Sequence, residues 1–298
     1  CGDHSPDARG NDTDQPDFYG GENAMKHRVL VNGLCLACLL LAGMCGSLSA
    51  GINLNVDGTL TRSFTLDPGG KTRGEIVVQN AGDEESEVKV FLQDYLHYAD
   101  GRALFQKTGT VGRSNASWIT MTPNQAVIPA KGSLTINFTL SVPPDPKLKG
   151  TYWSLLMIEP VPKSLLTPGK QENDVDIQVV TVIRLAVQMI TSIGKSGEAK
   201  LSFQNRSLTK EKNSRFLTLD LENTGERLLT PHVWTELFNK KGQSSGKIDG
   251  SKHRIYPGCS ARFVLDLSKL APGGYKAVVV ADNGDDNVFG ANYTLELK

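Results

Sequence analysis

Short runs of β-branched and aromatic residues constrain this chain more than any other feature of its sequence. They recur about every ten residues and are separated by turn-forming residues, as in Asp67-Pro68-Gly69-Gly70 and Asp100-Gly101. No stretch after the first fifty residues shows sustained helical periodicity. Regularly spaced strands without intervening helices favour antiparallel sheets, so the sequence predicts an all-β fold made of β-sandwiches.

The predicted strands fall into two series. The first comprises Leu60–Leu66, Gly74–Gln79, Glu87–His97, Ser117–Met121, Ala126–Ile128, Ser133–Val142, Gly150–Glu159 and the long run Val175–Ile190. The second comprises Ala199–Asn205, Phe216–Glu222, His232–Asn239, Lys252–Tyr256, Ser260–Leu267, Gly274–Asp282 and Val288–Leu297. We therefore expect two immunoglobulin-like sandwich domains in tandem, residues 51–192 and 198–298, joined by a linker at residues 193–197.

Residues 25–50 have the three parts of a secretory signal peptide. Met25 is followed by the basic Lys26-His27-Arg28, then by an apolar run to Met44, then by small residues ending at Ala50. The run is short for a transmembrane anchor and no stop-transfer pattern follows it, which favours cleavage near Ser49 or Ala50. Residues 1–24 are polar and acidic, and we expect them to be a disordered, mis-called extension upstream of the true start at Met25.

A signal peptide predicts secretion across the inner membrane of a bacterium into the periplasm or cell envelope. After its removal the chain keeps 32 − 3 = 29 basic and 32 − 6 = 26 acidic residues, a net charge of +3 without a long basic run. We expect no nucleic acid partner and no stable membrane insertion after cleavage. Cys259 would be the one remaining cysteine, either a buried small hydrophobe or a free turn thiol.

Motifs that could support catalysis or metal binding lack the context they need. Residues 242–246 match G-x-S-x-G, but no strand-to-helix turn surrounds them. The acidic loop 282–287 lacks the spacing of a calcium loop. His97, His232 and His253 stand far apart without cysteine neighbours. The sequence therefore predicts a protein that is not an enzyme and that has no cofactor and no metal site.

The run Val175–Ile190 combines two unusual features. Val175, Ile177 and Val179 alternate with polar residues and would share one face of a strand. Further on, Arg184 stands alone among apolar residues, and a guanidinium there must reach solvent, pair with an acid or meet an anionic ligand. The alternative to a ligand is a surface ion pair, with Glu159 or Asp94 as the acid.

The three tryptophans of the predicted domains, Trp118, Trp153 and Trp234, each lie in a predicted strand. Since aromatic residues dominate sandwich cores, we expect them in a core or an interface.

From Leu60 to Met189 the chain resembles the PapD-like periplasmic chaperones of pilus assembly. The stretch from Gly150 to Pro160 is similar to that family's sixth strand, and Val175–Val187 is similar to its G1 strand. The resemblance implies that Val175, Ile177 and Val179 are lent to an incomplete pilin subunit by donor-strand complementation, a form of strand addition. It also implies that Arg184, with Arg62 on the first strand, anchors the subunit's terminal carboxylate.

We therefore expect a periplasmic chaperone-like binding protein that captures an extended segment or C-terminus of a secreted partner by β-strand addition. The partner would be a pilin-like subunit or another envelope protein. The alternative is a non-catalytic structural or adhesion module of the cell envelope.

Overall fold

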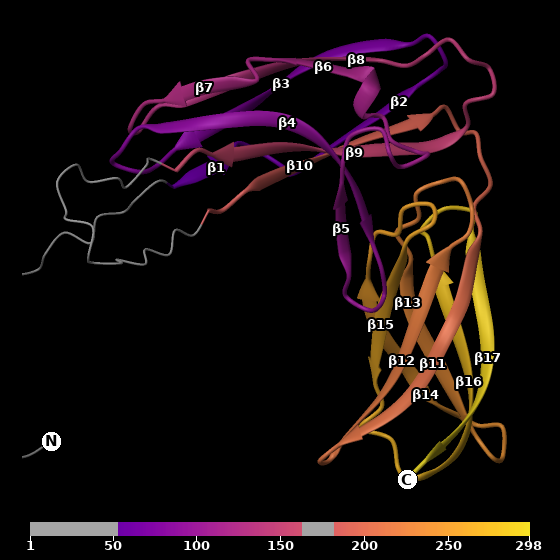
Figure 1. The fold of residues 1–298 in the computed structure, drawn as a ribbon. Helices are drawn as coiled ribbons and strands as arrows, with labels where there is room; N and C mark the ends of the chain where they lie inside the picture. The colour runs from indigo at the N-terminus through magenta and orange to yellow at the C-terminus, as the bar shows by residue number, and fades with distance from the viewer. Residues whose placement is uncertain (1–52, 163–181) are drawn as a thin grey trace, which may run out of the picture. The chain divides into compact units, whose positions relative to one another are not determined.

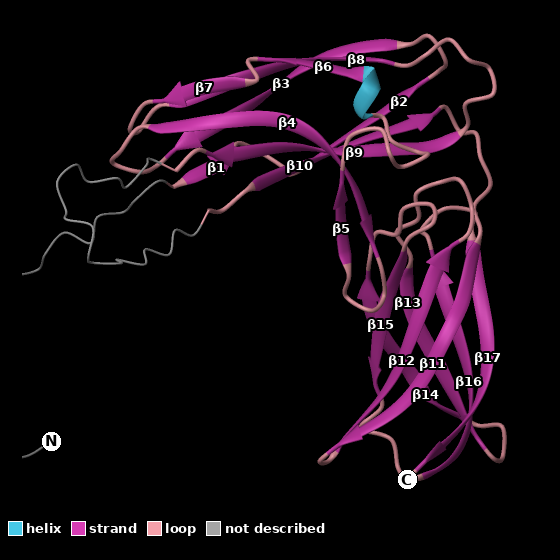
Figure 2. Cartoon of the chain, viewed as in Figure 1, coloured by secondary structure: helices cyan, strands magenta, loops and turns pink. Residues whose placement is uncertain are grey.

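The computed structural model describes residues 53–162 and 182–298, and the described chain is almost entirely β-sheet (Figures 1 and 2). The all-β prediction is confirmed. The predicted signal peptide and the extension before it lie outside the described residues. The described residues belong to one compact unit. Among the described residues no helix is long and apolar enough to cross a membrane.

The first sandwich consists of ten strands and one short 3-10 helix. Its elements are β1 (Leu54–Val56), β2 (Thr61–Leu66), β3 (Lys71–Asn80), β4 (Ser86–His97), β5 (Ala103–Gln106), η1 (Ala116–Trp118), β6 (Ile119–Thr122), β7 (Gln125–Ile128), β8 (Ser133–Ser141), β9 (Gly150–Pro160) and β10 (Leu185–Ile193). One sheet has the order β1-β3-β8-β6. The other has the order β2-β10-β9-β4-β5, with β7 also paired to β4.

The second sandwich has seven strands in two sheets. They are β11 (Leu201–Glu211), β12 (Ser214–Asn223), β13 (His232–Asn239), β14 (Ser244–Lys252), β15 (Ser260–Asp266), β16 (Gly273–Asp282) and β17 (Val288–Leu297). The orders are β11-β12-β15 and β14-β13-β16-β17, and every neighbouring pair is antiparallel.

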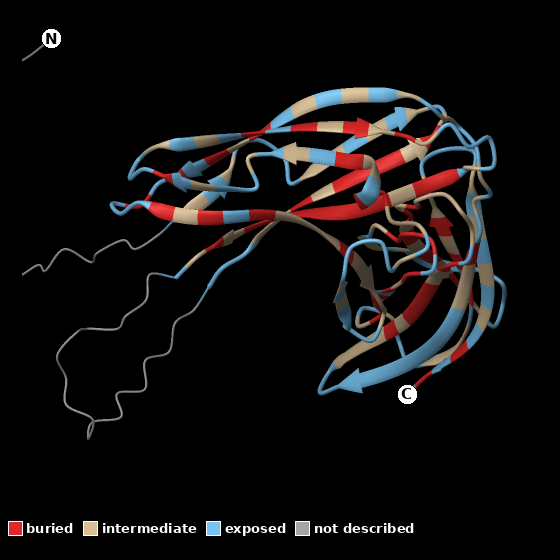
Figure 3. Ribbon diagram, turned by 45° about the horizontal axis from the view of Figure 1, so that its top comes forward, coloured by how far each residue is buried: buried red, intermediate tan, exposed pale blue. Residues whose placement is uncertain are grey.

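Alternation of apolar and polar residues explains why these strands form. Buried and exposed residues alternate along many of the strands (Figure 3). In β15 the residues Ala261, Phe263 and Leu265 are buried while those between them are exposed, so one face packs on the second core. Strand β9 differs, because its burial is nearly continuous along both faces. Leu156 and Ile158 enter the first core, whereas Trp153 belongs to the same cluster of buried residues as the second core.

Several of the predicted strands differ from the observed ones. The predicted strand Lys252–Tyr256 is wrong, because β14 ends at Lys252 and an irregular connection follows. Residues 244–251, where no strand is predicted, belong to β14, an edge strand held by β13 with little apolar patterning. Of the predicted strand Val175–Ile190, residues 175–181 lie outside the described residues; among the described residues β10 begins at Leu185 and continues to Ile193.

Gly150 packs against the backbone of the second sandwich. Its φ is +75°, and a Cβ there would lie 2.2 Å from the carbonyl oxygen of Glu226. The neighbouring Thr151 donates its N–H to the same oxygen at 2.8 Å and accepts the N–H of Leu228 at 2.9 Å through its hydroxyl. A side chain at position 150 would therefore clash with backbone.

We predict that Gly150→Ala lowers the free energy of unfolding by about 2–5 kcal/mol, the combined cost of a left-handed alanine and overpacking. Gly101 is the matched control, since its φ is +88° and nothing lies within 4 Å of its added Cβ. Gly101→Ala should lower it by only about 1–2 kcal/mol. Denaturant titration of both variants measures the difference, and equal losses would contradict the packing role of Gly150.

Candidate functional site

Strand β10 has neighbours on both sides along only part of its length. It pairs antiparallel with β9 from Leu185 to Ile193, but its parallel pairing with β2 begins only at Gln188. The N–H of Gln188 donates to the carbonyl of Leu60 at 2.9 Å. Since backbone groups alternate sides with period two, those of Ala186 point to this same side, where no described strand pairs with them, although β1 lies nearby. We call the segment Arg184–Val187 the open edge.

Apolar side chains surround the open edge. Ile183 is 72% exposed and Leu60 is 51% exposed. Both are among the large apolar residues that the described chain exposes to solvent. Leu185 and Val56 are half-buried against the first core. The core of the first sandwich therefore comes close to the surface where β10 lacks its second neighbour.

Arg184 lies on the face of the sheet that points away from the first core. Its Nε donates to Oε2 of Glu159 at 2.7 Å, and the arginine side chain is 56% exposed. This pairing matches one of the two acids expected from the sequence, while Asp94 is engaged elsewhere, accepting from Val111 N–H and Ser114 Oγ. An exposed pair of this kind contributes about 0–1 kcal/mol to stability.

Arg62 lies on the opposite face of the same sheet. It stands beside Met189, which is buried in the first core. Its guanidinium donates to the carbonyl of Thr59 and to the carbonyl of Asp57 at 3.1 Å. Arg62 therefore closes the turn before β2, a turn in which Gly58 has a φ of +76°.

The structure does not bring Arg62 and Arg184 together. Along β10, Arg184 precedes the position opposite Arg62 by 189 − 184 = 5 residues, and the two side chains leave opposite faces. Val175, Ile177 and Val179 lie outside the described residues.

Three residues that sequence reasoning missed meet on the outer face of β10. The side-chain oxygen of Gln188 accepts from the hydroxyl of Tyr256 at 2.8 Å and from Nη1 of Arg254. The same Nη1 donates to Thr61 Oγ1 at 3.2 Å. Within the described chain Arg254 thus has neutral acceptors and no carboxylate. The one sequence signal for this contact was Gln188, a polar residue within the apolar sequence of β10.

Trp153 and Tyr256 form the apolar part of this contact. Their rings stack with centroids 4.6 Å apart, and Trp153 Nε1 donates to the carbonyl of Tyr95 at 2.7 Å. Burial raises the pKa of Tyr256, so its hydroxyl stays protonated and can donate to Gln188. The prediction that Trp153 lies in a core or an interface is confirmed.

Cys259 lies fully buried in the second core. Burial raises the pKa of its thiol to about 11, which leaves the reactive thiolate scarce at neutral pH. Of the two alternatives for this residue, the structure supports the buried hydrophobe.

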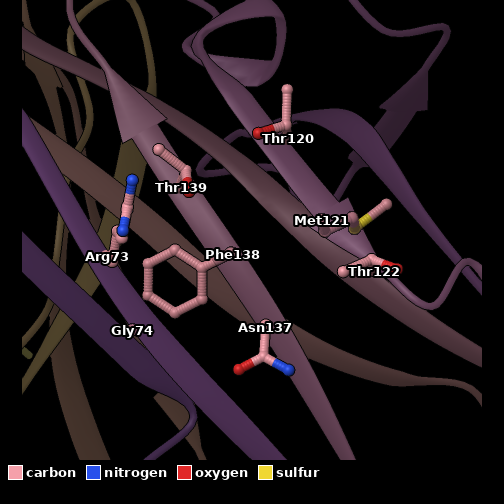
Figure 4. Close-up of a pocket in the computed structure, with 8 residues that line it drawn as sticks. All are labelled: Arg73, Gly74, Thr120, Met121, Thr122, Asn137, Phe138 and Thr139. Atoms are coloured by element: carbon pink, nitrogen blue, oxygen red, sulfur yellow. The ribbon is translucent and has the colours of Figure 1, made fainter.

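One hollow of about 270 Å³ opens on the sheet that contains β3, β8 and β6 (Figure 4). Phe138 lies over Gly74, and the polar lining includes Thr120, Asn137 and Arg73. Arg73 is its one ionisable lining residue, so the hollow offers no acid–base pair. No group of three or more potential metal ligands was found in the described part of the chain.

Several solved structures are similar to this chain. A chaperone–tip adhesin complex of CFA/I fimbriae matches with a TM-score of 0.44 and 14% identity, covering 83% of this chain and 100% of that one. The class 5 fimbriae chaperone CfaA matches with a TM-score of 0.42 and 14% identity, covering 81% and 98%. The CsuC–CsuE pre-assembly complex of Acinetobacter baumannii matches with a TM-score of 0.40 and 11% identity, covering 80% and 97%.

These structural neighbours are pilus chaperones, the family that the sequence resembles. Similarity at this level carries no argument about function, so function has to be inferred from the residues of the chain itself. No protein-family model matches the sequence. No curated protein matches it either.

His97 makes the contact around Arg254 sensitive to pH. Its Nε2 lies 3.0 Å from the carbonyl of Arg254, which can only accept, while its Nδ1 is buried without a partner among the described residues. Burial lowers the pKa of His97, and the charge of His253 lowers it further against the opposing effect of the Arg254 hydrogen bond. The folded protein therefore favours neutral His97.

We predict that stability falls as the pH drops below about 6.5, the pKa of an unfolded histidine. There the unfolded chain binds a proton that folded His97 resists, which costs at most about 1.4 kcal/mol per pH unit for one group. Denaturant titrations at pH 7.5 and 5.5 measure the loss. His97→Phe should make this decrease in the free energy of unfolding smaller. If the decrease is the same in that variant, the pH dependence comes from other groups.

Proposed function

We propose that this protein is a periplasmic chaperone-like binding protein that captures an extended segment of a secreted, pilin-like subunit by β-strand addition. The observation that carries the proposal is the open edge of β10, whose backbone pairs with β9 on one side and with no described strand on the other. An unpaired strand edge flanked by exposed apolar residues is a template for another strand.

The open edge supplies both components of strand addition. The backbone N–H and C=O of Ala186 supply hydrogen bonds to an incoming strand, since they face away from β9. Exposed Ile183 and Leu60 supply apolar surface at the same place. Main-chain bonds of this kind give affinity, and pockets for alternate side chains give specificity.

Val175, Ile177 and Val179 precede this edge in the sequence, and we propose them as the side chains lent to the partner. They are odd-numbered, as are Leu185 and Val187. Alternation with period two would give all of them a common face if the strand extends without a bulge.

For the anchor, we propose that a partner carboxylate competes with Glu159 for Arg184. Arginine can bind a carboxylate through two parallel hydrogen bonds, and this side chain is more than half exposed. Arg62 has weaker support, because its guanidinium is already engaged by the carbonyls of its own turn. We further propose that the protein is not an enzyme.

Ala186→Pro tests the open edge directly. Proline removes an N–H that points away from β9, so pairing with β9 should survive while the bond to a partner strand is lost. We expect the variant to recover at least tenfold less pilin-like subunit than wild type when both are purified from the periplasm. Ala186→Val is the control and should recover as much as wild type. Undiminished recovery with a folded Ala186→Pro variant would overturn strand addition at this edge.

A second experiment tests the lending face. Val175→Ser, Ile177→Ser and Val179→Ser are combined in one variant, and Asp176→Ser with Gln178→Ser in its control. Loss of the subunit from the first variant alone is expected, because only those side chains would fill apolar pockets in the partner. If both variants lose it equally, the segment acts without a preferred face.

Separate arginine variants test the anchor. Arg184→Ala should weaken subunit recovery while changing the free energy of unfolding by no more than about 1 kcal/mol, as exposed ion pairs contribute little. Arg62→Ala should act mainly on stability, measured by denaturant titration, since it closes a turn. Full recovery of subunit by the Arg184 variant would exclude this residue as the anchor.

A further inference from the structure

One end of the second sandwich gathers cations that are dispersed in the sequence. The turn between β11 and β12, the turn between β13 and β14 and the start of β16 lie at this end. The connection from β15 to β16 also lies there, because it joins the ends of the two sheets. We call this end the basic tip; it lies at the end of the second sandwich where the C-terminus is marked in Figure 1. Its exposed lysines are Lys210, Lys212, Lys240, Lys241, Lys269 and Lys276.

The positive charge of the basic tip is poorly neutralised. With Arg215 these lysines make seven cations against three side-chain carboxylates, Glu211, Asp266 and Glu296, and Lys298 lies at the same end. None of the seven forms an ion pair within the described residues. Asp266 already accepts from the hydroxyl and N–H of Ser268.

Arg215 adds an unusual buried charge to this end. Its Nε and Nη1 are buried and have no hydrogen-bond partner among the described residues. Its backbone is fixed, because its carbonyl accepts from Leu267 N–H and its N–H donates to Ser268 Oγ. An unpaired guanidinium held in place favours an anion nearby.

A hollow of about 300 Å³ lies between two of the lysines. Lys240, Lys276 and Tyr275 line it, and Glu296 lies across Gly274 from Lys240. Lys212, at the turn of the β11–β12 hairpin, has a φ of +55°, a left-handed conformation that asparagine or glycine would adopt at lower cost. A lysine thus stands where the backbone favours another residue.

We propose that the basic tip docks on the surface of an anionic phospholipid bilayer. Two of the cations line the hollow, but the others come from separate segments around the end of the sandwich, which suits a broad surface of diffuse charge better than one extended acidic peptide. Six of the seven are lysines, whose compact charge needs no directional partner, whereas arginine would favour bidentate recognition. This inference goes beyond the proposed function and does not depend on it.

Co-sedimentation with vesicles tests the inference on the full chain. We expect binding to vesicles of 70% phosphatidylcholine and 30% phosphatidylglycerol, no binding to pure phosphatidylcholine, and release by salt. The variant Lys240→Gln, Lys241→Gln, Lys269→Gln should bind at least tenfold more weakly. The control Lys71→Gln, Lys107→Gln, Lys147→Gln removes the same charge from exposed positions in the first sandwich and should bind like wild type.

Equal losses in the two triple variants would overturn the proposal, because the binding would then follow net charge alone. Failure of the wild type to bind anionic vesicles at low salt would overturn it as well. Polyglutamate serves as the probe for an acidic protein partner: if the basic tip binds it but not the vesicles, the membrane proposal fails. Matching melting curves of both variants would exclude misfolding as the cause of lost binding.

Discussion

The antiparallel pairing of β9 with β10 is the interaction on which the rest of the described structure depends. Nine residue pairs join the two strands, from Leu185–Ile158 to Ile193–Gly150. One face of this pair enters the first core through residues such as Met189, and the other brings Trp153 to the second core. A register shift of one residue would exchange these faces, so the two cores and the position of the open edge are set together.

Polar groups at the same pair of strands reinforce this register. The buried amide of Asn115 donates to the carbonyl of Met189 at 3.0 Å and to Thr191 Oγ1 at 2.9 Å, and it accepts from Ser154 Oγ at 2.7 Å. Buried polar groups are costly when unpaired, and a shift would leave several of them without partners. On the outer face, the side-chain oxygen of Gln188 accepts hydrogen bonds from Arg254 and Tyr256, and a register shift would break these bonds as well.

Whether an element could be predicted from the sequence depends on the interactions that stabilise it. Strands such as β15 were predicted because burial imposes alternation on their residues. Strand β14 was missed because it is an edge strand held by backbone pairing, with Ile248 as its one large apolar side chain. The contact between Gln188 and Arg254 joins residues 66 positions apart through side chains alone, so no local pattern indicates it. Glu159 could be predicted as an ion-pair partner of Arg184 because adjacent strands place the two residues opposite each other.

The buried thiol of Cys259 has a consequence for how the described domains fold. Cys259 is the one cysteine among the described residues. Because its thiol is buried and its pKa is raised, it is a poor nucleophile toward the disulfides of other proteins. Neither sandwich relies on a covalent cross-link, so both domains have to reach their native state by burial and backbone pairing. Folding of the described domains should then proceed equally well with or without a thiol oxidase, and Cys259 of the folded protein should not form mixed disulfides.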